Sequence, residues 1–480
     1  MGVEEGGDVA DQPKDMRTYL DALEQAGELL HIRKEVDPRA NLGGLAYAAQ
    51  NRMQRATMFE DLKGYAGWRA VSYICGSRRR LAIALGCNPE TFIPQWSKML
   101  EGGLTPCRAV SDGPVREVVW KGDQVDLNRI PIHRMADADS APYIGSGMGI
   151  VKDPDTGIRN VSLHRHQLKD KNKMGIYMFA GRHMDMIYQK YRQRGEPMPI
   201  AITIGHHGAY YLAANWTTGF GVDELEIAGT LLGEPVDLVK CESVDMEAPA
   251  YAEMVIEGLV DPEYREMEGP FTEHTGYARA GTGMNPVVTV TAITMRHDAI
   301  YYALQGGRPV SESQVLDGMP MEVGLYNRLR DVGGYVDLKD VVVPPYAAGA
   351  HVVIIQLAPT IEGQVNDVLM AALSSQWIHP KIAIAVDEDV NPHDPTEIMW
   401  SLSTRVNPVR DVFVIPNTRG HSLDASMPLL TKLDEYPVIR IGSRMGIDAT
   451  KPTKRTPQER SWLRRSIPMG LETNNLEDFT

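Results

Sequence analysis

Two glutamates, Glu268 and Glu273, stand five residues apart on either side of a Gly269-Pro270 pair. Proline fixes φ and lacks an amide hydrogen, and glycine permits unusual dihedral angles. The segment therefore predicts a shaped loop in which both carboxylates can face one cavity. A partly buried carboxylic acid in such a cavity is suited to donating a proton. The same spacing is also typical of two solvated glutamates beside a turn, because most glutamates are exposed.

Other polar residues could join such a site. Asn160 and Arg165 lie on one predicted strand, where strict alternation places them on opposite faces unless a bulge or strand end intervenes. His183 opens a predicted helix after Gly181-Arg182, where backbone amides could hold a phosphate and the imidazole could join it or bind a metal. Glu224 lies in the first turn of another predicted helix, where the helix dipole stabilises a carboxylate without any function.

Several common catalytic motifs are absent from the sequence. It contains no GxSxG elbow, no GxxxxGK[ST] phosphate loop and no HExxH helix. The glycine-rich run at 145–149 lies in a predicted hairpin without a following helix, so it does not indicate a dinucleotide site. The loop at 206–216 is rich enough in polar groups and turns to offer carbonyl ligands, although its spacing alone does not show that it does.

The elements that must position these residues fall into several predicted parts, of mixed α+β and α/β class. Residues 1–14 predict a polar, disordered tail, and residues 15–114 predict a small α/β lobe. Residues 115–315 predict mostly β structure, a twisted sheet closing into a split barrel with helical insertions. The expected strands are at 145–151, 158–167, 200–204, 236–241, 252–256, 287–294 and 299–304.

The alternation of strands and helices returns in the last third of the chain. Residues 316–332 predict a linker helix with its regular part at 321–330, and residues 333–480 predict a C-terminal α/β domain with a tail. We expect this domain to mediate oligomerisation, with the site in the cleft between it and the barrel.

Composition narrows the class of protein. The net charge of -14 over 480 residues and a pI near 5.5 argue against nucleic acid or an anionic membrane as the main partner. No apolar run approaches the roughly 18 residues needed to span a bilayer. The acidic N-terminus lacks the apolar segment of a signal peptide, so we expect a cytoplasmic protein. The four widely spaced cysteines predict reduced thiols, with neither a disulfide framework nor a zinc site.

Taken together, several segments make residues 15–460 resemble the UbiD family of prenylated-FMN-dependent (de)carboxylases. They occur in the order and spacing of that family: Asn160-Val161-Ser162-Leu163-His164-Arg165, Gly181-Arg182-His183, Phe220-Gly221-Val222-Asp223-Glu224-Leu225, Glu268-Gly269-Pro270-Phe271-Thr272-Glu273, Val386-Asp387-Glu388-Asp389-Val390 and Met445-Gly446-Ile447-Asp448-Ala449-Thr450.

The resemblance implies a set of ligands for a cofactor and its ions. Asn160, His183 and Glu224 match ligands of a divalent metal, usually manganese, which ties the cofactor phosphate to the protein. The backbone carbonyls of a second set match a potassium site: Ala213, Ala214 and Trp216. The positions expected to contact prenylated FMN are Asn160, Ser162, Leu163, His164, Arg165, Arg182, His183 and Lys381.

The resemblance also assigns Arg165, Glu268 and Glu273 to the catalytic network. Removing carbon dioxide from an aryl or vinyl carbon leaves an electron pair that no side chain can delocalise, so a cofactor must accept it. Arg165 can grip a carboxylate through a two-pronged hydrogen bond. We expect Glu273 to protonate the carbon and Glu268 to organise Arg165, with the reverse assignment left open.

Two departures from one branch of the family leave the substrate open. Arg182 stands where a neutral amide is frequent, and Arg419-Gly420-His421 falls in a variable region whose counterpart faces the substrate ring. A hydrogen-bonding His421 would suit a hydroxyl or a ring NH.

The sequence thus predicts a non-oxidative, reversible decarboxylase. Its expected substrate is a hydroxybenzoate-like, pyrrole-, indole- or furan-like, or α,β-unsaturated acid. A flavin prenyltransferase would supply the cofactor, and the chain would form a homodimer or homohexamer. The alternatives are an FMN-dependent oxidoreductase and a non-catalytic flavin- or metal-binding subunit.

Overall fold

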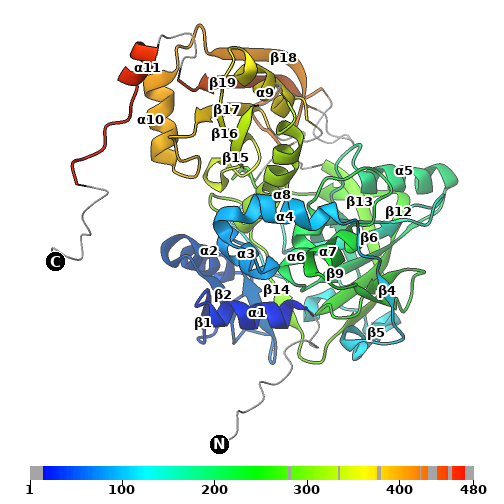
Figure 1. Cartoon of the computed structure of the whole chain (residues 1–480). Helices are drawn as coiled ribbons and strands as arrows, with labels where there is room; N and C mark the ends of the chain where they lie inside the picture. Colours follow the sequence, from blue (N-terminus) through cyan, green and yellow to red (C-terminus); the bar gives the residue numbers. More distant parts are fainter. Residues whose placement is uncertain are drawn as a thin grey trace, which may run out of the picture.

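The computed structural model describes residues 14–278, 283–332, 336–375, 380–421, 423–430, 440–451 and 457–470. Residues 1–13 of the predicted N-terminal tail and residues 471–480 lie outside the described part of the chain. Figure 1 shows the N-terminal lobe beside the barrel, and the C-terminal α/β domain beyond helix α8 (Glu312–Leu329). The predicted mixed α/β architecture is confirmed.

The N-terminal lobe is a small α/β unit. Helix α1 begins after Asp15, whose carboxylate accepts hydrogen bonds from the backbone N–H groups of Arg17 and Thr18. The helix buries Tyr19 and Leu23 against the sheet. The elements of the lobe are α1 (Met16–Gln25), β1 (Leu29–Ile32), α2 (Leu42–Met53), β2 (Ala56–Phe59), β3 (Arg69–Ser72), α3 (Arg78–Leu85), η2 (Pro89–Thr91) and α4 (Phe92–Glu101).

The sheet of this lobe is completed by a strand from much later in the chain. Strand β14 (Ile300–Tyr302) pairs in parallel with β3, giving the order β1-β2-β3-β14. The prediction placed 299–304 among the barrel strands, and this assignment is wrong. An apolar run indicates a buried strand but does not say which sheet it joins.

The central region forms the predicted barrel. Its strands run in the order β12-β9-β6-β7-β8-β13, and β12 also pairs with β13, which closes the sheet. Closure leaves no unpaired edge within the ring. The strands of the ring are β6 (Tyr143–Lys152), β7 (Arg159–Asp170), β8 (Lys173–Ile176), β9 (Met198–Ile204), β12 (Met254–Glu268) and β13 (Gly283–Met295).

Shorter elements surround the barrel. Strand β5 (Val118–Lys121) extends the sheet beyond β13, and β4 (Arg108–Ala109), β10 (Asp237–Lys240) and β11 (Glu247–Pro249) form a separate small sheet. The inserted helices and 3-10 turns are η3 (Pro114–Arg116), η4 (Gly122–Gln124), η5 (Leu127–Arg129), α5 (His183–Arg194), α6 (Gly208–Ala214) and α7 (Glu224–Leu232).

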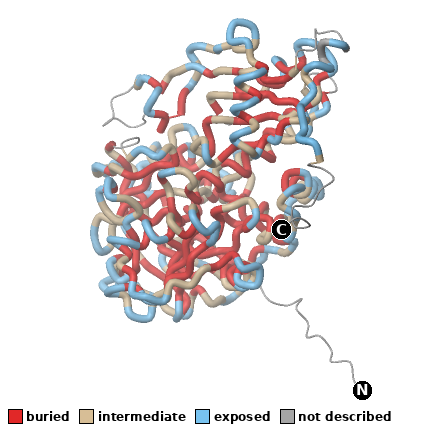
Figure 2. The backbone as a smooth tube through the Cα atoms, turned by 90° about the vertical axis from the view of Figure 1, so that its left-hand side faces the viewer, coloured by how far each residue is buried: buried red, intermediate tan, exposed pale blue. Residues whose placement is uncertain are grey.

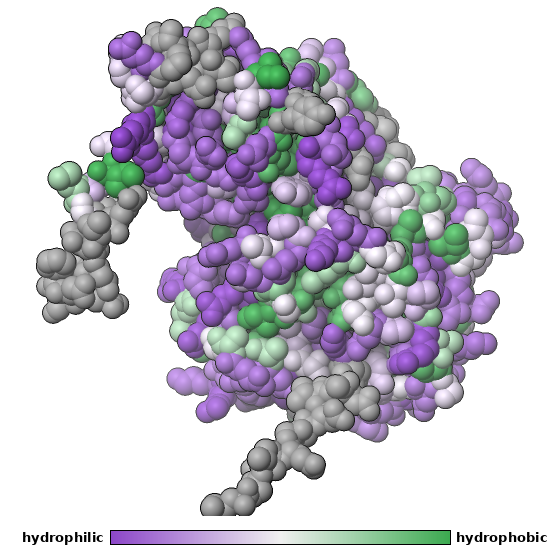
Figure 3. Space-filling view, in the orientation of Figure 1, coloured by the Kyte–Doolittle hydropathy of each residue, from purple (hydrophilic) through white to green (hydrophobic). Residues whose placement is uncertain are grey.

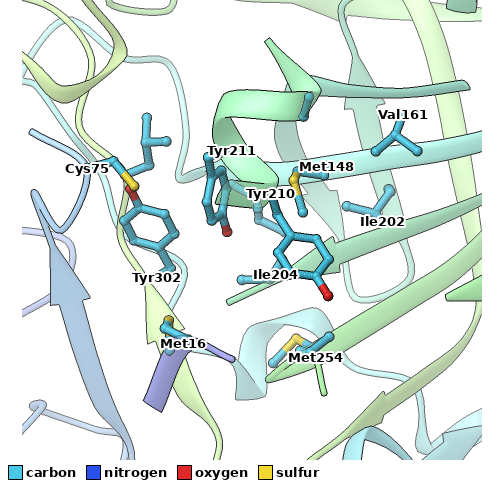
Figure 4. Close-up of a cluster of buried hydrophobic side chains, with 14 of the residues drawn as sticks. Met16, Cys75, Met148, Val161, Ile202, Ile204, Tyr210, Tyr211, Met254 and Tyr302 are labelled. Atoms are coloured by element: carbon cyan, nitrogen blue, oxygen red, sulfur yellow. The ribbon is translucent and has the colours of Figure 1, made fainter. Parts of the chain in front are cut away.

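The lobe and the barrel share one hydrophobic core. Figure 4 shows Met16 and Cys75 of the lobe in the same buried cluster as Met148, Ile204 and Tyr211 of the barrel region. Because a core of this kind removes apolar surface from water only while both parts are in place, it holds them together. Figure 2 shows buried segments both here and in the C-terminal domain, whose sheet packs around separate clusters.

The C-terminal domain has the predicted α/β alternation. Its sheet has the order β15-β16-β17-β19-β18, with β16, β17 and β19 parallel and both outer strands antiparallel. Its elements are β15 (Asp337–Val342), η6 (Pro345–Ala347), β16 (Val352–Ala358), α9 (Gln364–Leu373), β17 (Ile382–Asp387), α10 (Pro395–Arg405), β18 (Val412–Gly420), β19 (Arg440–Ala449) and α11 (Pro457–Trp462).

Helix α8 is longer than the linker helix predicted at 316–332. It begins after Ser311, which forms a capping box with Gln314, and continues through Pro320. A proline inside a helix removes a backbone hydrogen bond, and the predicted regular part at 321–330 starts just after it. Burial on both sides of the proline, at Leu316 and Val323, favours the continuous helix here.

The surface view shows how hydrophilic and hydrophobic residues are distributed on one face of the molecule. The face shown in Figure 3 is mostly hydrophilic, with hydrophobic residues in smaller areas between. Among the helices that the structure describes, none is long and apolar enough to cross a membrane.

Candidate active site

The predicted catalytic residues meet inside the barrel. Arg165 on β7 donates from Nε to Glu268 Oε1 at 3.1 Å and from Nη2 to Glu268 Oε2 at 2.6 Å. Asn285 donates to the same Oε2 at 3.2 Å. Burial opposes the charge of Arg165, but the Glu268 carboxylate outweighs it and raises the pKa of the guanidinium above its usual value. The pair is thus a buried, two-pronged ion pair.

Glu273 reaches the same guanidinium from the other side of the turn. Its Oε1 forms an ion pair with Nη1 of Arg165. Glu268 is 0% and Glu273 6% exposed, so the alternative of two solvated glutamates is wrong. Gly269 has φ +94°, a value that suits glycine and that other residues rarely adopt.

The loop around Glu273 is fixed by backbone contacts on both sides. Asp139 accepts the N–H of Thr272 at 2.7 Å and that of Ala136 at 3.0 Å. Gln314 on α8 donates from Nε2 to the carbonyl of His274 at 2.5 Å. The Glu273 N–H donates to the carbonyl of Tyr277 at 3.2 Å. The position of the Glu273 carboxylate is therefore set by the main chain around it.

A strand irregularity lies opposite Arg165. Ile144 of β6 pairs with His166, but the next partners are Gly147 and His164. Two residues of β6 therefore stand opposite Arg165 alone, as in a β-bulge. The extra residue lies in β6, so the alternation of β7 is unbroken, and Asn160 and Arg165 border two different cavities that are described below.

Arg165 and Glu273 border a cavity of about 140 Å³, which we call the acid cavity. Its walls are partly aromatic, and the guanidinium carbon of Arg165 lies 4.2 Å from the ring centre of Tyr177 and 5.0 Å from that of Phe271. Glu268 does not border this cavity. Its lining residues are Met135, Gly145, Leu163, His164, Arg165, Tyr177, Phe179, Asn215, Phe271, Glu273, His274, Leu304, Gly306, Ser313, Asp317, His421 and Leu423.

A second cavity of about 180 Å³, the cofactor cavity, adjoins the first. The residues bordering both are Leu163, His164, Phe179, Asn215, Asp317 and His421. The cofactor cavity alone is bordered by Asn160, Val161, Ser162, Arg182, His183, Met184, Asp185, Ala214, Trp216, Thr217, Thr218 and Glu224.

Asn160, His183 and Glu224 all face the cofactor cavity. Glu224, at the start of α7, accepts from Asn160 Nδ2 at 3.0 Å and from the Val161 N–H at 2.6 Å. Burial raises the pKa of Glu224 to about 8. Burial and the neighbouring Arg182 lower the pKa of His183, which favours the neutral imidazole.

This donor set fits a hard divalent cation. The buried Oδ1 of Asn160 accepts no hydrogen bond from any residue that the structure describes, and a cation would satisfy it. A buried carboxylate and a neutral imidazole complete the set. In the described ranges, no three His, Cys, Asp or Glu residues gather as a metal centre, so the amide of Asn160 is needed.

Ser162 and His164, which are predicted to contact the cofactor, border the cofactor cavity. His164 donates from Nδ1 to the carbonyl of Tyr177 at 3.0 Å, and its Nε2 lies 2.9 Å from the hydroxyl of Ser162. Burial lowers the pKa of His164 to about 4, so the ring is neutral and Nε2 accepts. Of the predicted potassium ligands, Ala214 and Trp216 border the cofactor cavity. The Ala213 carbonyl instead accepts the N–H of Trp216 at 3.0 Å.

Four predicted residues border neither cavity: Glu268 and Ala213, described above, and Lys381 and Arg419. Lys381 donates to Asp424 at 2.9 Å and to Ser426 at 2.9 Å, so its ammonium is held within the C-terminal domain. Arg419 donates to the carbonyl of Ala180 at 2.9 Å. The structure therefore brings His421, but not Arg419 or Lys381, to the candidate site.

Several site residues were missed by the sequence analysis. Asp139, Asn285 and Asp317 lie on three separate segments and belong to no recognisable motif. Tyr177 and Phe179 look like ordinary core aromatics in the sequence. Only the arrangement of the chain in space identifies them.

Comparisons with known proteins agree with this geometry. Family models of 3-octaprenyl-4-hydroxybenzoate carboxy-lyase match the N-terminal domain at residues 20–100, the Rift-related domain at 108–309 and the C-terminal domain at 314–449.

Solved structures of UbiD-class enzymes resemble the whole chain. HmfF from Pelotomaculum thermopropionicum in complex with FMN is 36% identical, with a TM-score of 0.87, over 97% of this chain and 100% of that one. An evolved dimeric form of HmfF in complex with prFMN is 34% identical, with a TM-score of 0.84, over 98% and 100%. Vanillic acid decarboxylase from Sedimentibacter hydroxybenzoicus, in open form, is 30% identical, with a TM-score of 0.82, over 98% and 98%.

Proposed function

The chain belongs to the UbiD family and is a prenylated-FMN-dependent carboxy-lyase, and from this premise we propose the roles of its own residues. The reaction is the non-oxidative, reversible decarboxylation of an aromatic, heteroaromatic or α,β-unsaturated acid. The observation that carries the assignment is the buried Arg165 between Glu268 and Glu273 at the aromatic acid cavity.

We propose that Arg165 orients the substrate carboxylate at the acid cavity. Glu268 neutralises the guanidinium and, with Asn285, fixes its plane. Because the pair is buried and aromatic side chains stand around it, water is kept from the carboxylate that is lost.

Glu273 is the proposed proton donor. It borders the acid cavity, whereas Glu268 does not. After carbon dioxide leaves, the Glu273 carboxylic acid delivers its proton to the carbon that carried the carboxylate, and the acid is then reprotonated from solvent. This difference in placement supports the assignment that the sequence left open.

The residues of the cofactor cavity would hold prenylated FMN and its ions. Bound there, the cofactor accepts the electron pair left on the substrate carbon. Asn160, His183 and Glu224 would ligate a divalent metal, proposed to be Mn²⁺, that meets the phosphate charge. The carbonyls of Ala214 and Trp216, with Ala213, would bind K⁺. Ser162, Leu163, His164 and Arg182 would contact the cofactor itself.

The wider setting is proposed on the same basis. The chain acts in the cytoplasm as a homodimer or homohexamer and receives its cofactor from a flavin prenyltransferase. The oxidoreductase and non-catalytic alternatives are disfavoured, because Arg165, Glu268 and Glu273 are all present and meet in one buried group.

The test is carbon dioxide release from a panel of aromatic and unsaturated acids. The protein is produced together with a flavin prenyltransferase, and its flavin content is measured first. In deuterium oxide the product should carry deuterium at the carbon that lost carbon dioxide. Fully loaded protein that releases carbon dioxide from none of the acids would contradict the proposed function.

A further inference from the structure

Tyr143 is the first residue of strand β6 and lies beside the catalytic loop. It is 0% exposed and pairs with Gln167 of β7. Residues opposite each other in an antiparallel pair point to the same face of the sheet, as do residues two apart on one strand. Tyr143, Gln167 and Arg165 therefore share one face, and Tyr143 is the diagonal neighbour of Arg165. Such a separation is within reach of an aromatic side chain.

The ring of Tyr143 packs on the aromatic wall beside Arg165. Its centre lies 4.5 Å from the ring centre of Phe271, and that centre lies 5.0 Å from the guanidinium carbon of Arg165. Phe271 belongs to the loop between the two glutamates and is buried. A gap on the Tyr143 side would leave this ring without contact atoms and free to shift. The tyrosine ring thus keeps Phe271 against Arg165.

The hydroxyl of Tyr143 faces polar groups. The Oγ of Ser140 lies 3.4 Å from it and accepts from Nε2 of Gln167 at 2.6 Å. Burial raises the pKa of Tyr143 above its usual value, and the charge of Glu268 and a hydrogen bond to its carboxylate add to this effect. The phenol is therefore neutral. Because a carboxylate can only accept, the Tyr143 O–H is the donor to Glu268.

This bond adds a third strand to the groups that hold Glu268. Arg165 on β7 binds both carboxylate oxygens, and Asn285 on β13 donates to Oε2 at 3.2 Å. Tyr143 donates from β6. A carboxylate held by donors from three strands is fixed in its plane, and it fixes the plane of the guanidinium that it binds.

The loop itself is anchored without the Tyr143 side chain. The N–H of Ser140 donates to the Pro270 carbonyl at 2.9 Å. Asp139 accepts the N–H of Thr272, as described above. Removing the Tyr143 hydroxyl should therefore leave the course of the loop unchanged and alter only how firmly the charged groups are held.

We propose that Tyr143 is a positioning residue for the decarboxylation. Its ring holds Phe271 against Arg165, and its hydroxyl holds the carboxylate of Glu268. The inference rests on the proposed decarboxylase function and adds to it a residue that borders neither cavity. Tyr143 acts on the rate through Arg165, which orients the substrate carboxylate and thereby the carbon that Glu273 protonates.

The experiment removes the hydroxyl and then the ring, using the flavin-loaded protein and the acid that wild type uses best. Tyr143→Phe keeps the ring, and kcat should fall by about tenfold, the usual scale for losing a hydrogen bond to a charged group. The guanidinium keeps its charge, so KM and flavin content should stay near the wild-type values. Tyr143→Leu also removes the ring and should lower kcat further.

Tyr188→Phe is the matched control. It also removes a buried hydroxyl in the barrel region, one that donates to the carbonyls of Asp261 and Pro262 at 2.8 and 3.1 Å. Tyr188 borders neither cavity. This variant should leave kcat and KM unchanged.

A double-mutant cycle separates positioning from a structural role. If the hydroxyl acts through Arg165, Tyr143→Phe should lower kcat/KM by less than about twofold in the Arg165→Lys background, where the two-pronged grip is already lost. A hydroxyl that only stabilised the fold would lower activity equally in both backgrounds and would lower the melting temperature. Melting temperature and flavin absorbance are measured on all four proteins.

Three results would overturn the inference. The first is a Tyr143→Phe protein with the wild-type kcat, and the second is an equal loss in both backgrounds. The third is a Tyr143→Phe protein that does not fold or that loses flavin, because the hydroxyl would then serve the fold. A wild-type protein that releases carbon dioxide from none of the acids at full flavin content would instead reject the proposed function.

Discussion

The barrel and the C-terminal domain contribute to the site in different ways. The barrel holds Arg165 and Glu268 on strands that share a continuous core with the N-terminal lobe. The C-terminal domain packs around separate clusters and borders the acid cavity with His421 and Leu423. The groups proposed for bond breaking thus lie on the most extensively packed part, and His421, the residue predicted to face the substrate ring, comes from a separately packed domain. Chemistry and substrate choice should be separable by mutation.

The largest effect is expected at the barrel side. Glu273→Gln keeps the size of the side chain but cannot deliver a carboxylic proton, so turnover should fall by roughly 10²-fold or more. Flavin content should stay at the wild-type level, because the cofactor cavity is bordered by other residues. Turnover, flavin absorbance and deuterium labelling are measured on the same samples. A wild-type rate at full flavin content would remove Glu273 as the proton donor.

Arg165→Lys should be nearly as damaging. One ammonium cannot replace the two parallel bonds to Glu268 and the ion pair to Glu273. A drop in kcat/KM of about 10²-fold is expected, measured with the acid that wild type uses best. A lysine variant within threefold of wild type would show that the two-pronged grip is not needed.

Glu224→Ala tests the cofactor cavity separately from the acid cavity. The change removes the carboxylate that bonds Asn160 and the Val161 N–H, so metal affinity should fall by at least about tenfold and flavin content with it. Elemental analysis and absorbance provide the readout, with Glu226→Ala, on the same helix but outside the cavity, as the control. Wild-type metal and flavin in Glu224→Ala would refute the metal assignment.

Asp139→Ala should have a smaller effect, because Asp139 positions Glu273 and does not border the acid cavity. Losing the acceptor for the Thr272 N–H should raise the activation free energy of the reaction by about 1 to 2 kcal/mol. The rate constant kcat should therefore fall roughly tenfold. KM and flavin content should change little, and Asp139→Asn should restore part of kcat. A fall in stability with unchanged kcat would indicate a purely structural role.

The smallest effect on turnover is expected from Arg405→Met in the C-terminal domain. Arg405 is buried and bonds Asp387 and Asp389 at 3.0 Å. Removing one partner of such a buried group should destabilise this domain by about 3 kcal/mol. Calorimetry should show the C-terminal domain unfolding at a lower temperature than in wild type, while the flavin stays bound. Loss of flavin together with that transition would contradict the separation of the two regions.

Much of this architecture could be predicted from the sequence, for reasons visible in particular segments. Strands β6 and β7 lie at the expected positions 145–151 and 158–167, within one to three residues at each end, and pair as the predicted hairpin. These features depend on local periodicity and turn residues. The sheet that β14 joins and the course of α8 through Pro320 depend on burial by distant parts of the chain, which local signals do not contain.

The same distinction applies to the site. The meeting of Glu268 and Glu273 at Arg165 was predicted because a loop and its motif carry that information. The bulge in β6 is a property of two paired strands and cannot be seen in β7 alone. Lys381 and Arg419 border neither cavity, because each is held by a partner, Asp424 and the Ala180 carbonyl, that becomes its neighbour only in the folded chain.

Strand β14 has a consequence for how the chain is made. During synthesis the N-terminal lobe leaves the ribosome with β1, β2 and β3, but its sheet lacks a strand until the whole barrel has been translated. The edge of β3 must wait uncovered for that time, which favours chaperone contact over early, independent folding. The lobe and the barrel are therefore one folding unit despite their separate appearance in the sequence. A fragment ending before Ile300 should aggregate, whereas one ending at the start of the C-terminal domain keeps every strand of that unit.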